Sequence, residues 1–257
     1  MSIVTTKAYK AHSQSIQDAF NFSVTVCFGM RTLENHLNEV DAGRTALVQP
    51  YHYAASTNTP AQLRTWSNTF ETQLSKHLLL AVFSYFESFV VDLVEEFVEF
   101  QSGYNAMITR AKRIDKAYIN KELPKELYGE LAKLRVAFQK NRLDRYRVAT
   151  RHLQREGFVF PTQTFSAYGI RRMKEELEKL RAFAIPNFLV DAFHVPLDPA
   201  DIKKYHDYRI LRNKVAHGDH VTLSLRQISE MNTMFGTWTS LINKHFCEHY
   251  FVIEKFV

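Results

Sequence analysis

The sequence predicts an all-α protein, an antiparallel helical bundle with additional helices, and three observations support this fold class. The 257 residues include 8 Gly and 7 Pro, about 3% of each, whereas roughly 7% and 5% are typical. A chain so poor in turn-forming residues suits long helices better than many short strands. Apolar residues recur every three or four positions over long stretches, as they do on one helical face. With 46% apolar residues, the composition is globular.

The N-terminal part of the chain predicts two long helices and a loop between them. Residues 12–40 are expected to be helical, although the apolar alternation over 20–28 also admits a strand. Residues 41–60 contain Gly, Pro and small polar residues, which are typical of a loop. Residues 61–102 contain neither Pro nor Gly and keep the helical repeat, so one long, bent helix is expected there.

The middle of the chain predicts a basic helical pair. Residues 104–121 form a helix that is basic on one side, and Pro124 opens a helix over 125–156. Residues 157–169 predict a loop or a short pair of strands.

Capping signals define the helices of the last third. Residues 170–184 predict a charged helix and 185–197 a short helix or turn. The run "DPAD", 198–201, offers a cap, a Pro at the first helical position and a first-turn acid, so a helix should run from there to His217. "SLRQ", 224–227, is a capping box for a last helix over 225–250.

These elements amount to seven or eight helices in a single helical domain over residues 1–257. Its core helices are expected at about 61–102 and 198–250, and the basic segment 104–156 is a candidate insertion.

The net charge of +6 is concentrated in one segment. Between Arg110 and Glu156 there are 14 Lys and Arg against 6 Asp and Glu, which gives +8 there and leaves −2 for the rest of the chain. Such a segment indicates a polyanionic partner, with nucleic acid as the first candidate. A solvated helical face is the alternative.

The chain shows no sign of secretion or membrane insertion. Its two cysteines have no clustered spacing, which favours a reducing cytoplasm over a disulfide scaffold. The N-terminus lacks the apolar region of a signal peptide. The most apolar stretch, 78–98, carries four acidic residues and therefore predicts a buried core helix rather than a membrane span.

The most informative motif is "RNKVAHG", in which His217 follows Arg212 by five positions. This spacing alone means little, because Arg31–His36 and Arg147–His152 share it. The context of Arg212 differs in three respects, one of which is the small size of Ala216 and Gly218 on either side of the histidine. Asn213 lies one helical turn before His217, and Gly218 ends the helix just after the histidine.

That context suits acid–base chemistry on an anionic substrate. The negative end of the helix dipole favours a protonated imidazole at His217, and Ala216 and Gly218 leave room for a ligand beside it. The arginine side chain is long enough to reach around the helix to the same groove.

"RNKVAHG" at the end of a bundle helix resembles the signature of HEPN domains (higher eukaryotes and prokaryotes nucleotide-binding). "FSYFESFVVDLV", 83–94, is similar to an earlier helix of prokaryotic HEPN ribonucleases, in which an acid lies in an aromatic-rich run. The resemblance covers residues 61–102 and 198–250, under half of the chain. It implies a helical homodimer in which two Arg/His motifs face one cleft.

The resemblance also implies a metal-independent endoribonuclease with no cofactor, of the kind found in toxin–antitoxin and phage-defence systems. His217 would be the acid–base group and Arg212 the phosphate clamp. Asn213 would orient the phosphate or the histidine, and Glu87 would support Arg212 or His217. The implied partners are RNA, a second copy of the chain and an antitoxin or regulator.

Two other functions stay open at this point. One is a non-catalytic HEPN-like module that binds a nucleotide or a partner protein. The other is a helical scaffold in which the motif is only a solvated helix end or a salt-bridged interface.

No other pattern indicates a site of comparable weight. His217 and His220 are separated by a helix break, and His245 and His249 form an i,i+4 pair without the H-E-x-x-H order, so neither pair predicts a metal centre. The default for both cysteines is a buried structural role. No phosphate-binding Gly-rich loop and no G-x-S-x-G motif is present.

Overall fold

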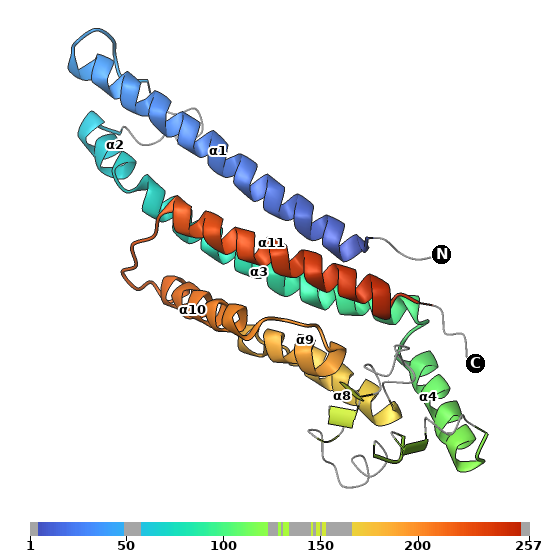
Figure 1. The fold of residues 1–257 in the computed structure, drawn as a ribbon. Helices are drawn as coiled ribbons and strands as arrows, with labels where there is room; N and C mark the ends of the chain where they lie inside the picture. The colour runs from blue at the N-terminus through green and yellow to red at the C-terminus, as the bar shows by residue number, and fades with distance from the viewer. Residues whose placement is uncertain are drawn as a thin grey trace. The chain divides into compact units, whose positions relative to one another are not determined.

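The structure is a computed structural model that describes residues 5–48, 58–122 and 166–252, together with short pieces between 128 and 152. All regular structure in these ranges is helical, which confirms the all-α class (Figure 1). The helices traced from end to end are α1 (Lys7–Asp41), α2 (Pro60–Ser67), α3 (Phe70–Phe100), α4 (Tyr104–Ile119), α8 (Ala167–Glu178), α9 (Ile185–Phe193), α10 (Pro199–Ala216) and α11 (Leu225–His249). A 3₁₀ turn, Ala182–Ala184, precedes α9.

Several expected helices are confirmed. α1 includes the whole of 12–40, so the strand alternative over 20–28 is wrong, and α4 corresponds to the helix expected over 104–121. The short helix α9 forms within 185–197. Most of the helix expected over 125–156 lies outside the described residues.

The long helix expected over 61–102 is interrupted. α2 ends at Ser67 and α3 begins at Phe70, with a turn at Asn68 and Thr69. The Thr69 hydroxyl donates to the Trp66 carbonyl oxygen at 3.1 Å. Asn and Thr side chains compete with the helical backbone for hydrogen bonds, so the apolar repeat continues while the helix does not.

The charged helix expected over 170–184 is shifted toward the N-terminus. Ser166 caps α8, because its hydroxyl oxygen accepts a hydrogen bond from the Gly169 N–H at 3.4 Å. Residues 167–169 are therefore helical, although they were expected in a loop or strand pair. The helix ends at Glu178, ahead of the 3₁₀ turn.

The chain divides into two compact units, each assembled from separate stretches. Unit 1 comprises Met1–His12, Phe86–His206 and Phe235–Val257, and unit 2 comprises Ser13–Tyr85 and Asp207–Met234. The expectation of a single domain over 1–257 stays a prediction.

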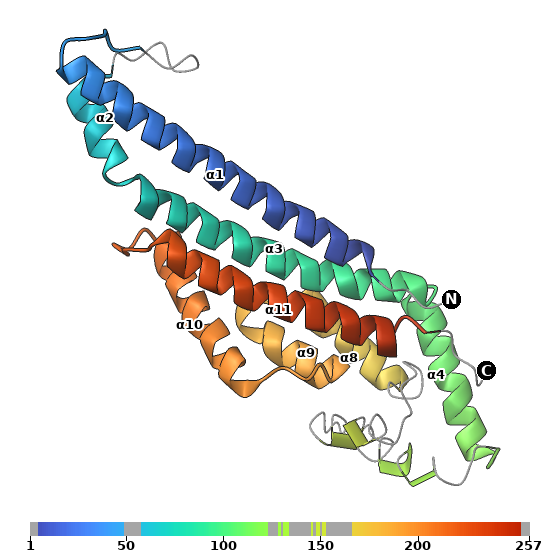
Figure 2. The ribbon, with the colours of Figure 1, turned by 45° about the horizontal axis from the view of Figure 1, so that its top comes forward.

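Aromatic side chains form the core of unit 1. The rings of Phe86 and Phe235 have centroids 4.7 Å apart, and those of Phe97 and Phe246 are 6.3 Å apart. These two contacts are in the same order along both helices, so the second halves of α3 and α11 run side by side in one direction (Figure 2). Tyr205 of α10 stacks on Trp238 at 5.5 Å.

The start of α1 is held by polar groups of two other elements in unit 1. Glu96 of α3 accepts hydrogen bonds from the backbone N–H groups of Lys7 and Ala8, both at 2.9 Å. The Thr6 hydroxyl donates to the Asn243 side-chain oxygen of α11 at 2.8 Å. Because the first turn of α1 has no acidic residue of its own, Glu96 supplies the negative charge that a helix N-terminus favours.

Unit 2 is built on the second part of α1 and the first part of α3. Leu37, Leu78 and Phe83 are buried. The Ser67 hydroxyl donates to Glu34 at 2.9 Å, which ties the end of α2 to α1.

Among the described residues, α3 is the one helix long and apolar enough to cross a membrane. Half of the most apolar 18-residue stretch of α3 is buried within the protein. This is consistent with the core helix of a soluble protein, as the acidic residues within 78–98 predict.

We expect Glu96→Gln to destabilise unit 1, because the neutral amide offers one acceptor oxygen and no negative charge to two N–H donors. The expected loss in the free energy of unfolding is about 1.5 kcal/mol, measured by urea denaturation. Glu99→Gln removes the same charge from an exposed position of the same helix and serves as the control. An equal effect of the two substitutions would contradict the capping role.

Candidate nucleic-acid site at the end of α10

The start of α10 follows the predicted capping pattern. The Asp198 carboxylate accepts a hydrogen bond from the Ala200 N–H at 2.6 Å, and Pro199 is the first helical residue. In unit 1, Tyr205 is fully buried and its hydroxyl donates to the Ala182 carbonyl oxygen at 2.7 Å. The register of α10 is therefore set before the chain reaches the motif.

The end of α10 is a glycine-terminated Schellman motif. The Asp219 N–H donates to the Lys214 carbonyl oxygen at 3.0 Å, and the Gly218 N–H donates to the Val215 carbonyl oxygen at 3.1 Å. Gly218 has a φ of 83°, which a residue with a side chain rarely adopts. This places His217 at the C-cap, immediately after the last helical residue.

The structure shows how the motif residues meet. An Arg212 Nη1–H donates to the Asn213 side-chain oxygen at 3.2 Å, and both residues are half-buried. His217 is exposed, and its backbone N–H donates to the Asn213 carbonyl oxygen at 2.9 Å. Asn213 thus orients the arginine, an interaction that its position in the sequence did not predict.

Glu87 is a half-buried residue of α3. It belongs to unit 1, whereas Arg212, Asn213 and His217 belong to unit 2. The expected support of Arg212 or His217 by Glu87 stays a prediction.

The two other Arg–His pairs with the same spacing have different surroundings. In α1, the His36 Nε2 accepts a hydrogen bond from the Val48 N–H at 3.3 Å, so this histidine holds the loop that follows the helix. Arg147 lies outside the described residues.

In the His245–His249 pair near the C-terminus, His245 has a structural role. His245 is buried, and its Nε2 is 2.8 Å from the Phe193 carbonyl oxygen. The rings of His245 and His249 have centroids 4.6 Å apart. Across the described ranges, no group of three or more His, Cys, Asp or Glu side chains is arranged to hold a metal. Cys247 is buried and Cys27 half-buried, and both are free thiols.

Sequence reasoning missed His194, which ends α9 in a left-handed conformation. Its Nδ1 is 3.3 Å from the Val190 carbonyl oxygen. Burial lowers the pKa of His194 to about 4, with a smaller contribution from the Arg151 charge. Burial likewise lowers the pKa of His245 to about 4. The hydroxyl of Tyr250 donates to the same Phe193 carbonyl oxygen as His245, at 2.8 Å.

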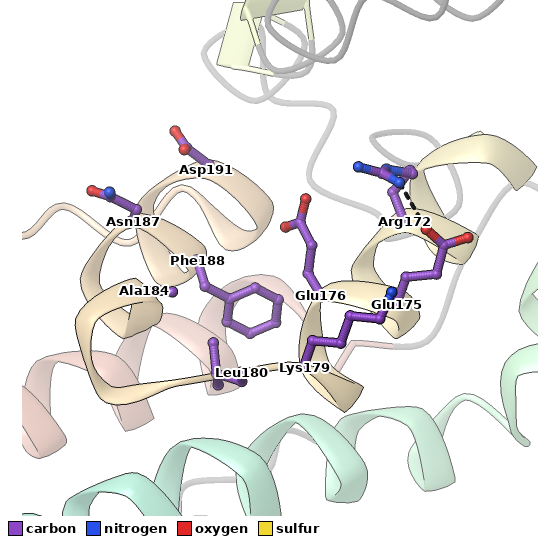
Figure 3. Close-up of a pocket in the computed structure, with 9 residues that line it drawn as sticks. All are labelled: Arg172, Glu175, Glu176, Lys179, Leu180, Ala184, Asn187, Phe188 and Asp191. Atoms are coloured by element: carbon purple, nitrogen blue, oxygen red, sulfur yellow. Dashed lines mark hydrogen bonds and ion pairs between the residues drawn. The ribbon is translucent and has the colours of Figure 1, made fainter.

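A cavity of about 340 Å³ lies between α8 and α9 in unit 1. Figure 3 shows Glu176 of α8 and Asp191 of α9 on opposite sides of it, with Phe188 between them. Arg172 pairs with Glu175 at 2.7 Å, and Arg151 pairs with Asp191 at 2.6 Å. Because the lining contains both acidic and basic side chains, it favours no single charge of ligand. No sequence motif marked this cavity.

No family model, no curated protein and no solved structure matches this chain. The resemblance to HEPN domains therefore rests on the residues named above.

We expect unit 1 to lose stability in mild acid. Since the pKa of both His194 and His245 lies below the ordinary 6.5 in the folded state, the unfolded chain binds more protons. The contribution of the two neutral histidines to the free energy of unfolding is present above about pH 6.5 and is lost as the pH falls toward 4. At pH 5 the loss is about 2 kcal/mol for each histidine. Urea unfolding at pH 7.5 and pH 5.0 measures the difference.

His245→Gln keeps a donor for the Phe193 carbonyl oxygen but cannot titrate, so it should remove about half of this pH dependence. His220→Gln, at an exposed position, should leave it unchanged. If the free energy of unfolding is the same at both pH values, the pKa values of His194 and His245 are not lowered in the folded protein.

Proposed function

We propose that the protein is a metal-independent endoribonuclease and that Arg212, Asn213 and His217 form its site. One observation carries the proposal. An exposed histidine stands at the cap of α10, one turn after an asparagine that holds a guanidinium. Proton transfer and phosphate stabilisation are the two functions that RNA cleavage requires of a protein, because RNA supplies the nucleophile.

In the proposed reaction, the 2′-oxygen attacks the adjacent phosphorus. The bond from the 2′-oxygen to phosphorus forms as the bond from phosphorus to the 5′-oxygen breaks, which leaves a 2′,3′-cyclic phosphate and a 5′-hydroxyl. His217 takes the proton of the 2′-hydroxyl while water protonates the leaving 5′-oxygen, or His217 protonates the leaving oxygen while water takes the 2′-hydroxyl proton. Arg212 binds the non-bridging phosphate oxygens and stabilises the charge that develops on them.

Asn213 and Glu87 have positioning roles in this proposal. The Asn213 side-chain oxygen accepts a hydrogen bond from one Nη1–H of the guanidinium, so in this proposal it orients Arg212 toward the phosphate. Glu87 supports Arg212 or His217, as the resemblance implies.

The proposed partners are RNA, a second copy of the chain and an antitoxin or regulator, with toxin activity or phage defence in the cytoplasm as the setting. α4 supports a polyanionic partner, because Lys112, Arg113 and Lys116 are all exposed on it.

We expect the wild type to cleave RNA in the presence of EDTA and to leave a 2′,3′-cyclic phosphate. His217→Ala should lower the rate by about 10²- to 10⁴-fold, and Arg212→Ala by about 10²- to 10³-fold. Arg212→Lys should stay impaired, because a lysine lacks the planar fork. Rates are measured with a labelled RNA under single-turnover conditions, with circular dichroism to confirm that each variant is folded.

The matched control is His220→Ala, an exposed histidine three residues further along, which should retain full activity. A 2′-O-methylated RNA should resist cleavage. Cleavage that survives His217→Ala would overturn the mechanism. RNA that is bound but never cleaved would favour the non-catalytic binding module.

We also expect the basic residues of α4 to contribute to RNA affinity through charge. Replacing Lys112, Arg113 and Lys116 with Gln should weaken RNA binding and reduce its dependence on salt. The slope of the logarithm of the binding constant against the logarithm of the salt concentration should become shallower by roughly 0.7 for each phosphate that the variant leaves unneutralised. Replacing Lys203, Lys204 and Arg226 with Gln removes the same net charge from other exposed positions. An equal weakening of binding in the two triple variants would indicate that only net charge matters.

A further inference from the structure

A cavity of about 530 Å³ lies among α3, α4 and α8 in unit 1. Val91 and Val98 of α3 and Leu177 of α8 form the apolar part of its lining. Its volume is within the range of small-molecule sites, which usually combine apolar walls with a few polar groups. We call it the Tyr104 cavity, after the residue of α4 that lines it.

The charged groups of the Tyr104 cavity are mostly acidic. Glu95 and Glu99 of α3 and Glu178 of α8 stand against one base, Lys174, so the formal charge of the lining is −2. Lys174 pairs with Glu178 at 3.6 Å. Glu95 and Glu99 are exposed, and neither forms an ion pair with a residue that the structure describes. These two carboxylates give the cavity a surplus of negative charge that attracts a cation.

The cavity already receives one ammonium group of the protein itself. The Nζ of Lys174 lies 5.5 Å from the centre of the Tyr104 ring. At this distance the negative face of an aromatic ring attracts a cation. A ligand with ammonium groups would therefore meet the same two kinds of partner that Lys174 meets, a carboxylate and a ring.

The Tyr104 hydroxyl is a buried polar group that has no hydrogen-bond partner among the described residues. The turn at the end of α3 sets its place, because the Gly103 N–H donates to the Val98 carbonyl oxygen at 2.8 Å and Tyr104 then begins α4. Burial, with smaller contributions from the charges of Glu95 and Glu178, raises the pKa of Tyr104 to about 12. The hydroxyl thus stays protonated at neutral pH, and its oxygen can accept a hydrogen bond from a ligand N–H.

We propose that the Tyr104 cavity binds an aliphatic diamine or a longer polyamine. In the complex, the hydrocarbon chain of the ligand lies on the two valines and the leucine and is removed from water. Its ammonium groups bind the carboxylates of Glu95 and Glu99, and the Tyr104 oxygen accepts one of their N–H groups.

The spacing of the acids favours this class of cation over a metal ion. Glu95 and Glu99 are one helical turn apart, about 6 Å along α3. An extended chain of four methylene groups separates its two nitrogens by about the same distance. Within the described ranges, no three His, Cys, Asp or Glu side chains are arranged to hold one metal. The negative charges are therefore spread along the cavity, as the positive charges are along a diamine.

This site is separate from the proposed RNA cleavage. The Tyr104 cavity lies within unit 1, whereas Arg212, Asn213 and His217 belong to unit 2. Diamine binding is measured without RNA, so the failure of one proposal is distinguishable from the failure of the other.

Isothermal titration calorimetry of the full chain with 1,4-diaminobutane, at constant ionic strength, tests the site. We expect a dissociation constant of about 1 mM or below, and at least five-fold weaker binding of n-butylamine, which has one ammonium group. Replacing both Glu95 and Glu99 with Gln should weaken diamine binding about ten-fold. Replacing Glu175 and Glu230 with Gln is the control, because it removes the same charge from exposed positions outside the cavity.

Two single substitutions test the hydroxyl and the internal ammonium group. Tyr104→Phe should weaken diamine binding about five-fold and leave the free energy of unfolding unchanged, since no described residue bonds to the hydroxyl. Lys174→Gln should tighten diamine binding, because it removes a competing cation. Lys179→Gln, which removes the same charge from the C-cap of α8 outside the cavity, should not.

The proposal is overturned if 1,4-diaminobutane does not bind at millimolar concentrations. It is also overturned if the Glu95 and Glu99 double variant and Tyr104→Phe both bind the diamine as tightly as the wild type. Displacement of the diamine by MgCl₂ at the same ionic strength would equally contradict it, because the cavity would then attract any cation.

Discussion

Burial of the apolar side of α3 is the constraint on which the rest of the fold depends. In unit 1, its rings contact four other helices: Phe89 meets Tyr9 of α1, Phe97 meets Phe193 of α9, and Phe86 meets Tyr205 of α10 and Phe235 of α11. A fully buried Phe contributes up to about 3 kcal/mol of transfer free energy, so these contacts outweigh the polar interactions around them. Within unit 1, Tyr205 also ties the first half of α10 to this core through its stacking on Trp238.

Acidic residues of α3 contact the first residues of two other helices. Glu96 of α3 accepts the first N–H groups of α1, and Glu71, at the start of α3, accepts the N–H of Leu225 at 3.3 Å. Both acids come from another helix, and each satisfies donors that a helix N-terminus cannot satisfy internally. The starts of α1 and α11 are thereby coupled to α3, and α11 has this contact in addition to its own Ser224–Gln227 capping box.

The sequence predicted what local chemistry controls. The Asp198-Pro199 start of α10, the Ser224–Gln227 capping box and the Gly218 stop all appear as expected, because each acts within one helical turn. The interruption at Asn68–Thr69 was not predicted, since the apolar repeat continues through it. His194 was missed as well, because its low pKa arises from burial among residues distant in sequence. The Arg212–Asn213 hydrogen bond depends on side-chain rotamers, which spacing does not specify.

The two Arg–His pairs that lie within the described residues show why spacing is a poor guide to this kind of site. His36 uses its Nε2 lone pair to accept the Val48 N–H, so this nitrogen already has a partner within the protein. His217 is exposed at a helix end, and the asparagine one turn before it accepts a hydrogen bond from the arginine. The same interval of five residues thus serves loop attachment in α1 and presents a candidate acid–base group in α10. What distinguishes them is their position in the helix: His217 is exposed at the end that Gly218 gives α10, whereas His36 is half-buried within α1.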